Sequence, residues 1–299
     1  MVKTRSIILV TTLRTALCFA VTLLMVGMSA NAEIRLPHLL SDHAVLQREA
    51  PIHLWGWASP GAQLRLTFHD QVVSSIVDSI GEWNVWLKPE AAGGPYELIV
   101  AGDGERRITD IMVGDVWFAG GQSNMQFPLK GFSNAPMKDS AREIASARNP
   151  SIRLMLVGRK GSNSPLNDIT GSWADSTPQT AADFSATGYL FAQGVAAREH
   201  VTVGIIEATW GGTPAGSWLS MDTLGNDASL LPVFSAQADL LAGPIHRGEQ
   251  LDALSQWSQE KNAAPVRHGW RPDLVSWTPT SIYNGMIAPC TGYSLRGFI

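Results

Sequence analysis

The chain has 299 residues, of which 22 are lysine or arginine and 26 are aspartate or glutamate, so its formal charge is −4. Hydrophobic residues make up 45% and charged residues 16%, a balance that supports a buried core and excludes a disordered or charge-driven protein. The acidic balance, without any lysine- or arginine-rich run, excludes nucleic acid as an expected partner. The length leaves room for two ordinary domains.

Residues 1–32 predict a signal peptide. Basic residues precede or flank an apolar stretch at 15–28, and Ala30-Asn31-Ala32 follows as a small-x-small cleavage site. A retained membrane anchor is the alternative, but the stretch is short for a span of about 20 residues, so no integral membrane segment is expected after cleavage. We expect an exported protein, periplasmic or secreted. Because Cys18 leaves with the leader, Cys290 remains alone and no intrachain disulfide is expected.

Residues 33–109 predict a β-rich, sandwich-like domain. Short apolar or alternating stretches at 52–57, 63–68, 82–87 and 96–100 indicate antiparallel strands. Turn residues such as Pro60-Gly61 and Gly93-Gly94-Pro95 separate them.

Four tryptophans in this region have two interpretations. They are Trp55, Trp57, Trp83 and Trp86. Aromatic faces suit carbohydrate rings, so the four side chains could form a sugar-stacking platform. Alternatively they fill the core of a thin sandwich, and we favour the core.

Residues 110–299 predict an α/β domain. Near-continuous apolar runs at 111–119, 152–157 and 201–206 indicate strands covered on both faces. Helical patterns lie at 136–147 and at 184–199, the second with Asp183 placed to cap its start. Strands that alternate with helices favour a parallel sheet.

Ser123 follows the first of these apolar strands directly, after Gly120-Gly121-Gln122. Ligands lie at the carboxyl ends of parallel strands, so this serine stands where a nucleophile would be presented. Backbone N–H groups at the following helix start would then stabilise an oxyanion. The next strand end carries Gly211-Gly212, which allows the backbone to approach the same point. Ordinary glycine-rich loops are the alternative for both, and Met125 departs from the G-x-S-x-G pattern of α/β-hydrolases.

Four segments, taken in order, resemble the sialate O-acetylesterase family, a branch of the SGNH hydrolases that removes acetyl groups from sugars. They are Gly114-Asp115-Val116-Trp117, Gly121-Gln122-Ser123-Asn124-Met125, Trp210-Gly211-Gly212-Thr213-Pro214 with Trp218, and Tyr283-Asn284-Gly285-Met286-Ile287-Ala288-Pro289. The resemblance spans about residues 34–299. It implies a flavodoxin-like α/β/α domain and a serine esterase that acts on acetylated carbohydrate through an acyl-enzyme, without metal or organic cofactor.

The resemblance also implies roles for individual residues. Ser123 matches the nucleophile, and its N–H together with that of Gly211 or Gly212 matches two oxyanion donors. Beside them, the candidate substrate-binding residues are Gln122, Asn124 and Trp218.

The chain departs from the family after residues 295–299. Family members continue into a Gly-Glu-Ser-Asn segment with an oxyanion asparagine and an Asp-x-x-His segment with the base, and neither is present here. His246 and His268 lie where nothing matches that base. We therefore expect an α/β domain truncated at its C-terminus, a fourth strand with an unpaired edge, and impaired esterase activity. A catalytically inactive fragment or a glycan-binding module is the alternative, and an unidentified partner chain that completes the sheet stays open.

Overall fold

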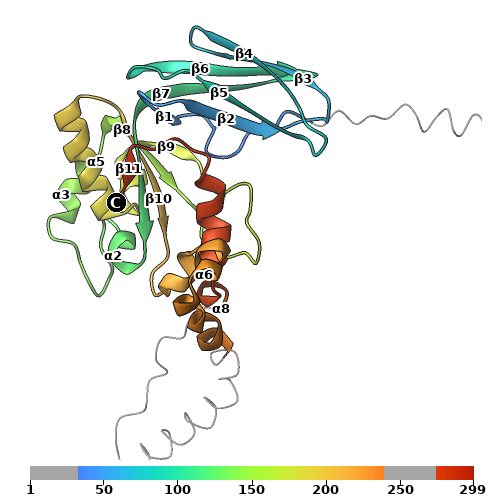
Figure 1. The fold of residues 1–299 in the computed structure, drawn as a ribbon. Coiled ribbons are helices and arrows are strands. Elements are labelled where there is room, and N and C mark those ends of the chain that lie inside the picture. Colours follow the sequence, from blue (N-terminus) through green and yellow to red (C-terminus); the bar gives the residue numbers. More distant parts are fainter. Residues whose placement is uncertain (1–32, 239–273) are drawn as a thin grey trace, which may run out of the picture.

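The computed structural model describes residues 33–238 and 274–299 (Figure 1). The predicted signal peptide, His246 and His268 lie outside these ranges. Within them, every helix is too short or too polar to cross a membrane.

The first half of the described chain is built of strands. Their bounds are β1 Val45–Gln47, β2 Ile52–Trp57, β3 Gln63–Phe68, β4 Gln71–Ile76, β5 Glu82–Leu87, β6 Gly93–Gly102 and β7 Gly104–Gly121. β2, β3 and β5 occupy the predicted ranges because alternation places every second side chain, such as Leu64 and Leu66 of β3, in the core. Sequence reasoning missed β1 and β4. The segment Gly93-Gly94-Pro95 lies inside β6, where the register with β7 shifts, and not in a turn.

These strands form two sheets. β2 and β5 pair antiparallel as a two-stranded sheet, and β4, β3, β6 and β7 follow one another in a larger one. The inward side chains of both, among them Leu54, Trp83 and Phe68, belong to one hydrophobic cluster. The larger sheet continues through β7 into the second half of the chain, in the order β4-β3-β6-β7-β10-β8-β9.

Strand β7 joins the two predicted regions. Its first part pairs antiparallel with β6, and residues 115–121 pair parallel with β10. The sequence boundary between 33–109 and 110–299 falls inside this strand. The pattern changes there because the first residues of β7 are largely exposed whereas residues 111–119 are mostly buried.

The second half adds further strands and short helices. The strands are β8 Asn149–Leu156, β9 Trp173–Ser176, β10 Val203–Thr209 and β11 Gly297–Phe298. The helices are α2 Ser123–Gln126, α3 Ser140–Ala145, α4 Pro178–Ala182, α5 Ala186–Glu199, α6 Met221–Asn226 and α8 Leu274–Trp277, with single turns at Ala215–Trp218, Ala228–Leu230, Tyr283–Ile287 and Ala288–Cys290. β7, β8, β10 and β11 run parallel and β9 is antiparallel at the edge. The α/β class is confirmed.

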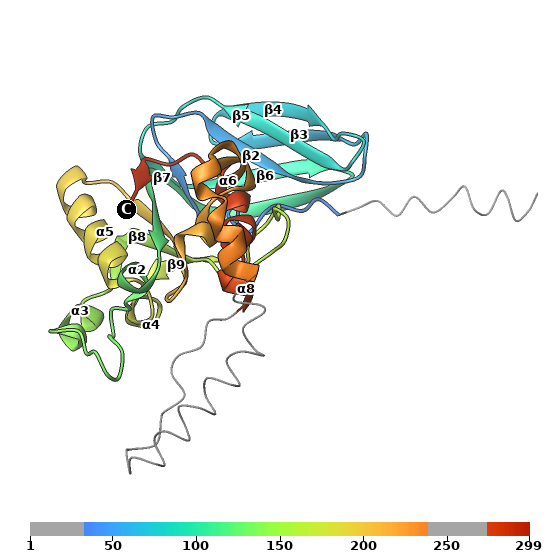
Figure 2. The same ribbon diagram turned by 60° about the horizontal axis from the view of Figure 1, so that its bottom comes forward.

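Helices cover the parallel strands. α5 packs against β10, all seven residues of which are buried. α4 packs against β9, and α3 lies beside α4 (Figure 2). Asp183 does not cap α5: it ends α4, and Ser185 caps α5 by accepting from the Gly188 N–H at 3.0 Å. The physical reason is that α5 begins two residues later than predicted, which leaves Ser185 at the capping position.

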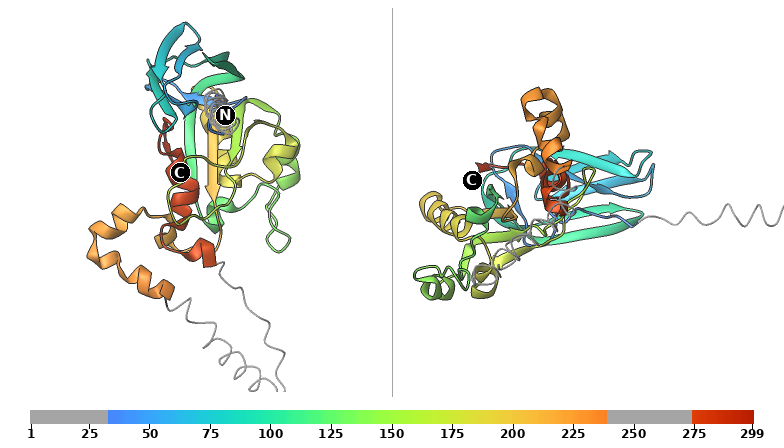
Figure 3. Two further views of the ribbon diagram at one scale, coloured as in Figure 1. Left: turned by 90° about the vertical axis from the view of Figure 1, so that its right-hand side faces the viewer. Right: turned by 90° about the horizontal axis from the view of Figure 1, so that it is seen from below.

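The chain end lies beside β7 (Figure 3, left). β11 pairs Gly297 with Trp117 and Phe298 with Phe118. The Phe298 side chain is 72% exposed, and among the described strands only β7 pairs with β11. The predicted fourth parallel strand therefore exists, with one edge paired.

Candidate active site

The carboxyl ends of β7 and β10 bring Ser123 and Gly211 together. The two strands run parallel in register up to Gly121 opposite Thr209, and the Trp210 N–H donates to the Gly121 carbonyl oxygen at 3.0 Å. Ser123 begins α2 two residues after β7 ends, and Gly211 follows β10 at the same distance. A serine hydroxyl and a glycine-rich turn thus share one edge of the sheet, as the sequence predicts.

The backbone at this edge is open around the serine. Gly121 has a backbone φ of 145°, a conformation that residues with a side chain rarely adopt, and it lies where the chain turns from β7 into α2. Ser123 is exposed. A methyl group on Gly211 would lie 2.6 Å from Gln126 Oε1 and 3.4 Å from Ser123 Oγ, so the Gln126 side chain is what requires glycine at this position.

Two glutamine side chains occupy the N–H groups that the sequence predicts as oxyanion donors. The Ser123 N–H donates to Gln122 Oε1 at 2.6 Å, and the Gly211 N–H donates to Gln126 Oε1 at 2.5 Å. Gly212 has φ of 77°, and its carbonyl oxygen accepts from Trp277 Nε1 at 2.7 Å. The Gly211 N–H, which lies on the side of the turn near Ser123 Oγ, already donates to the side-chain carbonyl oxygen of Gln126.

The three candidate substrate-binding residues fall into two groups. Gln122 and Asn124 flank Ser123 in the chain and are exposed, and the structure gives the Asn124 side chain no partner within the described ranges. Trp218 is half-buried, and its Nε1 donates to Thr213 Oγ1 at 2.9 Å. The Thr213 hydroxyl in turn donates to the Trp210 carbonyl oxygen at 2.7 Å. Trp218 therefore stabilises, through the Thr213 hydroxyl, the turn that contains Gly211.

The described histidines are engaged away from Ser123. They are His38, bonded to Asp168; His43, bonded to Asp110; His53, bonded to Gly292; His69, near Glu90; and His200, which ends α5. Ser123 Oγ has no hydrogen-bond partner in the described part of the chain. No residue described here therefore stands as its general base.

Glu207 lies directly before the turn at the end of β10, and sequence reasoning missed it. Its side chain accepts from the Ser185 N–H at 2.7 Å and from Thr209 Oγ1 at 2.7 Å, so it ties the start of α5 to β10. Burial raises the pKa of this carboxyl group, and those two hydrogen bonds and the charge of Arg159 partly counteract it. In the sequence, the signal for Glu207 is that it is a single charged residue within an apolar strand.

Two groups of histidine and carboxylate side chains lie close enough together to coordinate one metal ion each. Within the described ranges they are His43, Asp110 and Asp175, and His69, Asp70 and Glu90. In the first group Arg153 forms ion pairs with both carboxylates, so a protein cation already balances their charge. The second group is largely exposed, and neither lies beside Ser123 at the end of β7.

Several known proteins are similar to this chain in sequence. No protein-family model matches the chain. The chain is 29% identical to the sialate O-acetylesterase of Homo sapiens over 213 residues, covering 64% of this chain and 40% of that protein. It is 26% identical to the sialate O-acetylesterase of Mus musculus over 298 residues, covering 92% of this chain and 52% of that protein.

A solved structure is similar as well. The crystal structure of a carbohydrate acetylesterase from Xanthomonas citri aligns with a TM-score of 0.68 and 33% identity, covering 89% of this chain and 50% of that chain. The chain spans about half the length of the curated relatives it matches. These relatives confirm that the chain resembles the sialate O-acetylesterase family.

Proposed function

We propose that this chain carries the nucleophile and part of the oxyanion site of a carbohydrate O-acetylesterase of the sialate type. The observation that carries the proposal is the exposed Ser123 at the end of β7 with the Gly211 turn of β10 beside its hydroxyl. Relatives named sialate O-acetylesterase and a carbohydrate acetylesterase support an acetylated sugar as the substrate.

The reaction follows from the positions of these groups. Ser123 Oγ attacks the acetyl carbonyl carbon as its proton leaves, and the carbonyl oxygen becomes an oxyanion. The N–H groups of Ser123 and Gly211 donate to that oxyanion, and each such donor typically lowers the barrier by about 3 kcal/mol. Collapse breaks the ester bond, the sugar oxygen takes up a proton, and water then hydrolyses the acetyl-serine to release acetate.

The glutamine side chains that accept from the Ser123 and Gly211 N–H groups compete with the substrate for these donors. An amide carbonyl oxygen resembles an ester carbonyl oxygen, so Gln122 and Gln126 occupy the donors as a substrate carbonyl would. The substrate must displace at least the Gln126 oxygen before Gly211 can donate to it.

Activity of this chain alone is proposed to be low. A serine without a base is a weak nucleophile at neutral pH, and Ser123 has no base within the described ranges. The same observation favours a second candidate, a catalytically inactive member of the family.

Serine-directed labelling and acetate release test the proposal. Wild-type chain treated with a fluorophosphonate should carry the label on the Ser123 peptide and release acetate slowly from an O-acetylated sugar. Ser123→Ala should lose both, while Ser79→Ala, a change at an exposed serine far from β10 in the chain, should lose neither. Absence of label and of acetate would establish the inactive alternative, and equal turnover by Ser123→Ala would refute the assigned nucleophile.

A further inference from the structure

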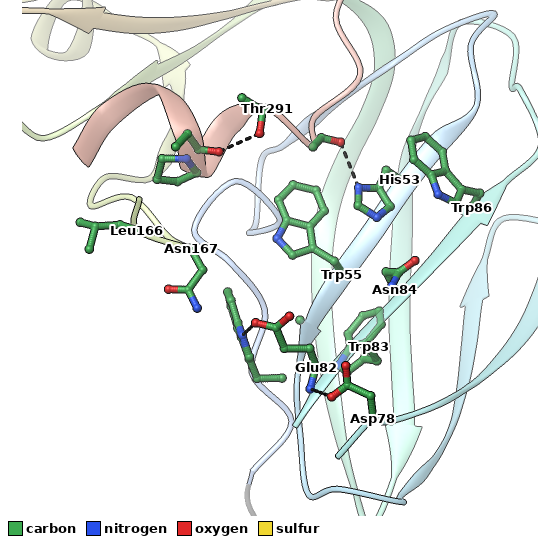
Figure 4. A pocket seen from close by; sticks show the side chains of 15 residues that line it. His53, Trp55, Asp78, Glu82, Trp83, Asn84, Trp86, Leu166, Asn167 and Thr291 are labelled. Atoms are coloured by element: carbon green, nitrogen blue, oxygen red, sulfur yellow. Dashed lines mark hydrogen bonds between the residues drawn. The ribbon is translucent and has the colours of Figure 1, made fainter. Parts of the chain in front are cut away.

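A cleft lies between the two-stranded sheet and the C-terminal segment. It measures about 570 Å³ and is lined by residues of β2 and β5, by Leu166 and Asn167, and by residues that include Thr291 and Gly292 (Figure 4). Figure 1 places β2 and β5 at the end of the molecule away from α2, so this cleft is separate from Ser123.

Strand alternation separates the tryptophans into two sets. β2 and β5 pair antiparallel, with His53 opposite Trp86 and Trp55 opposite Asn84, so these side chains share one face. Trp83 points to the other face and is 2% exposed in the core. Trp86 is 57% exposed. All four tryptophans, Trp57 included, are among the residues that line the cleft. The core interpretation holds for Trp83, which is buried, whereas the Trp86 ring is largely exposed.

The aromatic rings of the cleft are stacked and held in place. The His53 ring lies 4.9 Å from the Trp55 ring and 4.3 Å from the Trp86 ring, at interplanar angles of 18° and 14°. His53 Nδ1 donates to the Gly292 carbonyl oxygen at 3.0 Å, which fixes the middle ring. Burial lowers the pKa of His53, so the stack carries no charge at neutral pH. His53 covers one face of the Trp86 ring, and the other face of this largely exposed ring can pack against the C–H face of a sugar ring.

Polar side chains surround the rings. Asn84 and Asn167 are exposed, and their side-chain amides have no partner in the described part of the chain, so each offers both a donor and an acceptor to a hydroxyl group. Asp78 and Glu82 contribute carboxylates to the lining of the cleft. The Glu82 carboxylate accepts a hydrogen bond from Trp57 Nε1 at 3.3 Å. None of the described lining residues is lysine or arginine. The local charge is therefore negative and disfavours an anionic ligand.

We propose that this cleft binds a neutral glycan chain, with one sugar ring against the exposed Trp86 ring and with Asn84 and Asn167 at hydroxyl groups of the chain. The inference goes beyond the proposed esterase and does not depend on it, since Ser123 takes no part. Because Asp78 and Glu82 repel a carboxylate, the cleft disfavours sialic acid and uronic acids as occupants.

Binding by the full chain tests the inference. Ser123→Ala protein, which removes any turnover, is titrated with cellohexaose, xylohexaose and mannohexaose, and with hexagalacturonate as an anionic hexamer, by calorimetry and by tryptophan fluorescence. At least one neutral hexamer should bind with a Kd of about 1 mM or tighter, and hexagalacturonate should not bind.

Variants localise the binding. Trp86→Ala should weaken binding about tenfold by removing one ring, whereas Trp86→Phe should retain most of it. Ile76→Ala, which changes an exposed apolar residue of β4 outside the cleft, should bind as the parent does. Because Trp86 is largely exposed, circular dichroism of its variants should match the parent. Failure of all three neutral hexamers to bind, unchanged binding by Trp86→Ala, or equal binding of hexagalacturonate would overturn the inference.

Discussion

Gln126→Ala offers the sharpest test of how the site around Ser123 works. The Gln126 side chain accepts from the Gly211 N–H, the group proposed to stabilise the oxyanion. Removing it leaves this N–H free to donate to the substrate. We therefore expect Gln126→Ala to make acylation of Ser123 faster.

The magnitude follows from one neutral hydrogen bond. Such a bond contributes a net ~0.5–1.5 kcal/mol, and this is the free energy that a substrate carbonyl must offset to displace Gln126. Each 1.36 kcal/mol changes a rate about tenfold, so acylation should become roughly two- to tenfold faster. Stability should fall by less than about 1 kcal/mol, because both groups are only half-buried and water can replace the lost acceptor.

The assay is the rate of Ser123 acylation by p-nitrophenyl acetate, followed by mass spectrometry of the Ser123 peptide and corrected with Ser123→Ala. Gln179→Ala, at an exposed glutamine of α4, is the matched control and should leave the rate unchanged. A slower rate in Gln126→Ala would refute the reasoning, because it would mean that Gln126 holds Gly211 in the productive position.

Two further predictions concern stability. Glu207→Gln should flatten the pH dependence of unfolding: burial raises the pKa of Glu207 in the folded state, so its contribution is greatest below its unfolded pKa of about 4.3 and is lost as pH rises through the folded value. Urea unfolding at about pH 4.5 and about pH 8 measures this. Gly285→Ala should lower the free energy of unfolding by about 1–3 kcal/mol, because its methyl group would overlap the Lys160 carbonyl oxygen.

Each stability prediction has its own contrary result. If the difference in unfolding free energy between wild type and Glu207→Gln stays constant or grows in favour of wild type as pH rises, the assigned ionisation is wrong. Gly194→Ala is the control for Gly285→Ala, since nothing lies within 4 Å of the added methyl group inside α5, and it should stabilise by about 0.5–1 kcal/mol. Equal loss in both glycine variants would show that the Lys160 contact is not the cause.

Local patterns predicted most of the individual strands. Alternation at 52–57, 63–68 and 82–87 marks β2, β3 and β5 because one face of each strand is buried. β4 was missed because its residues alternate only between half-buried and exposed, which weakens the signal. The continuity of β7 across residue 110 was missed because its two parts have different neighbours.

The site was predictable at the level of the backbone. Glycines after β7 and β10 indicate turns at the ends of parallel strands, and such ends lie at one edge of a sheet, which brings Ser123 near Gly211. The hydrogen-bond partners of the side chains were not predictable, because bonds such as the one that the Gly211 N–H donates to Gln126 Oε1 join residues far apart in the chain.

Alternation of apolar residues, strand ends at glycine, and a serine after a buried strand can all be read from the amino-acid sequence, because these properties depend on neighbours within a few positions. The burial of Trp83 and the exposure of Trp86, the continuity of β7 through both halves, and the hydrogen bond from the start of α5 to Glu207 become visible only in the folded chain. These outcomes depend on which strands pair and on which surfaces meet, and the packing of distant segments sets both.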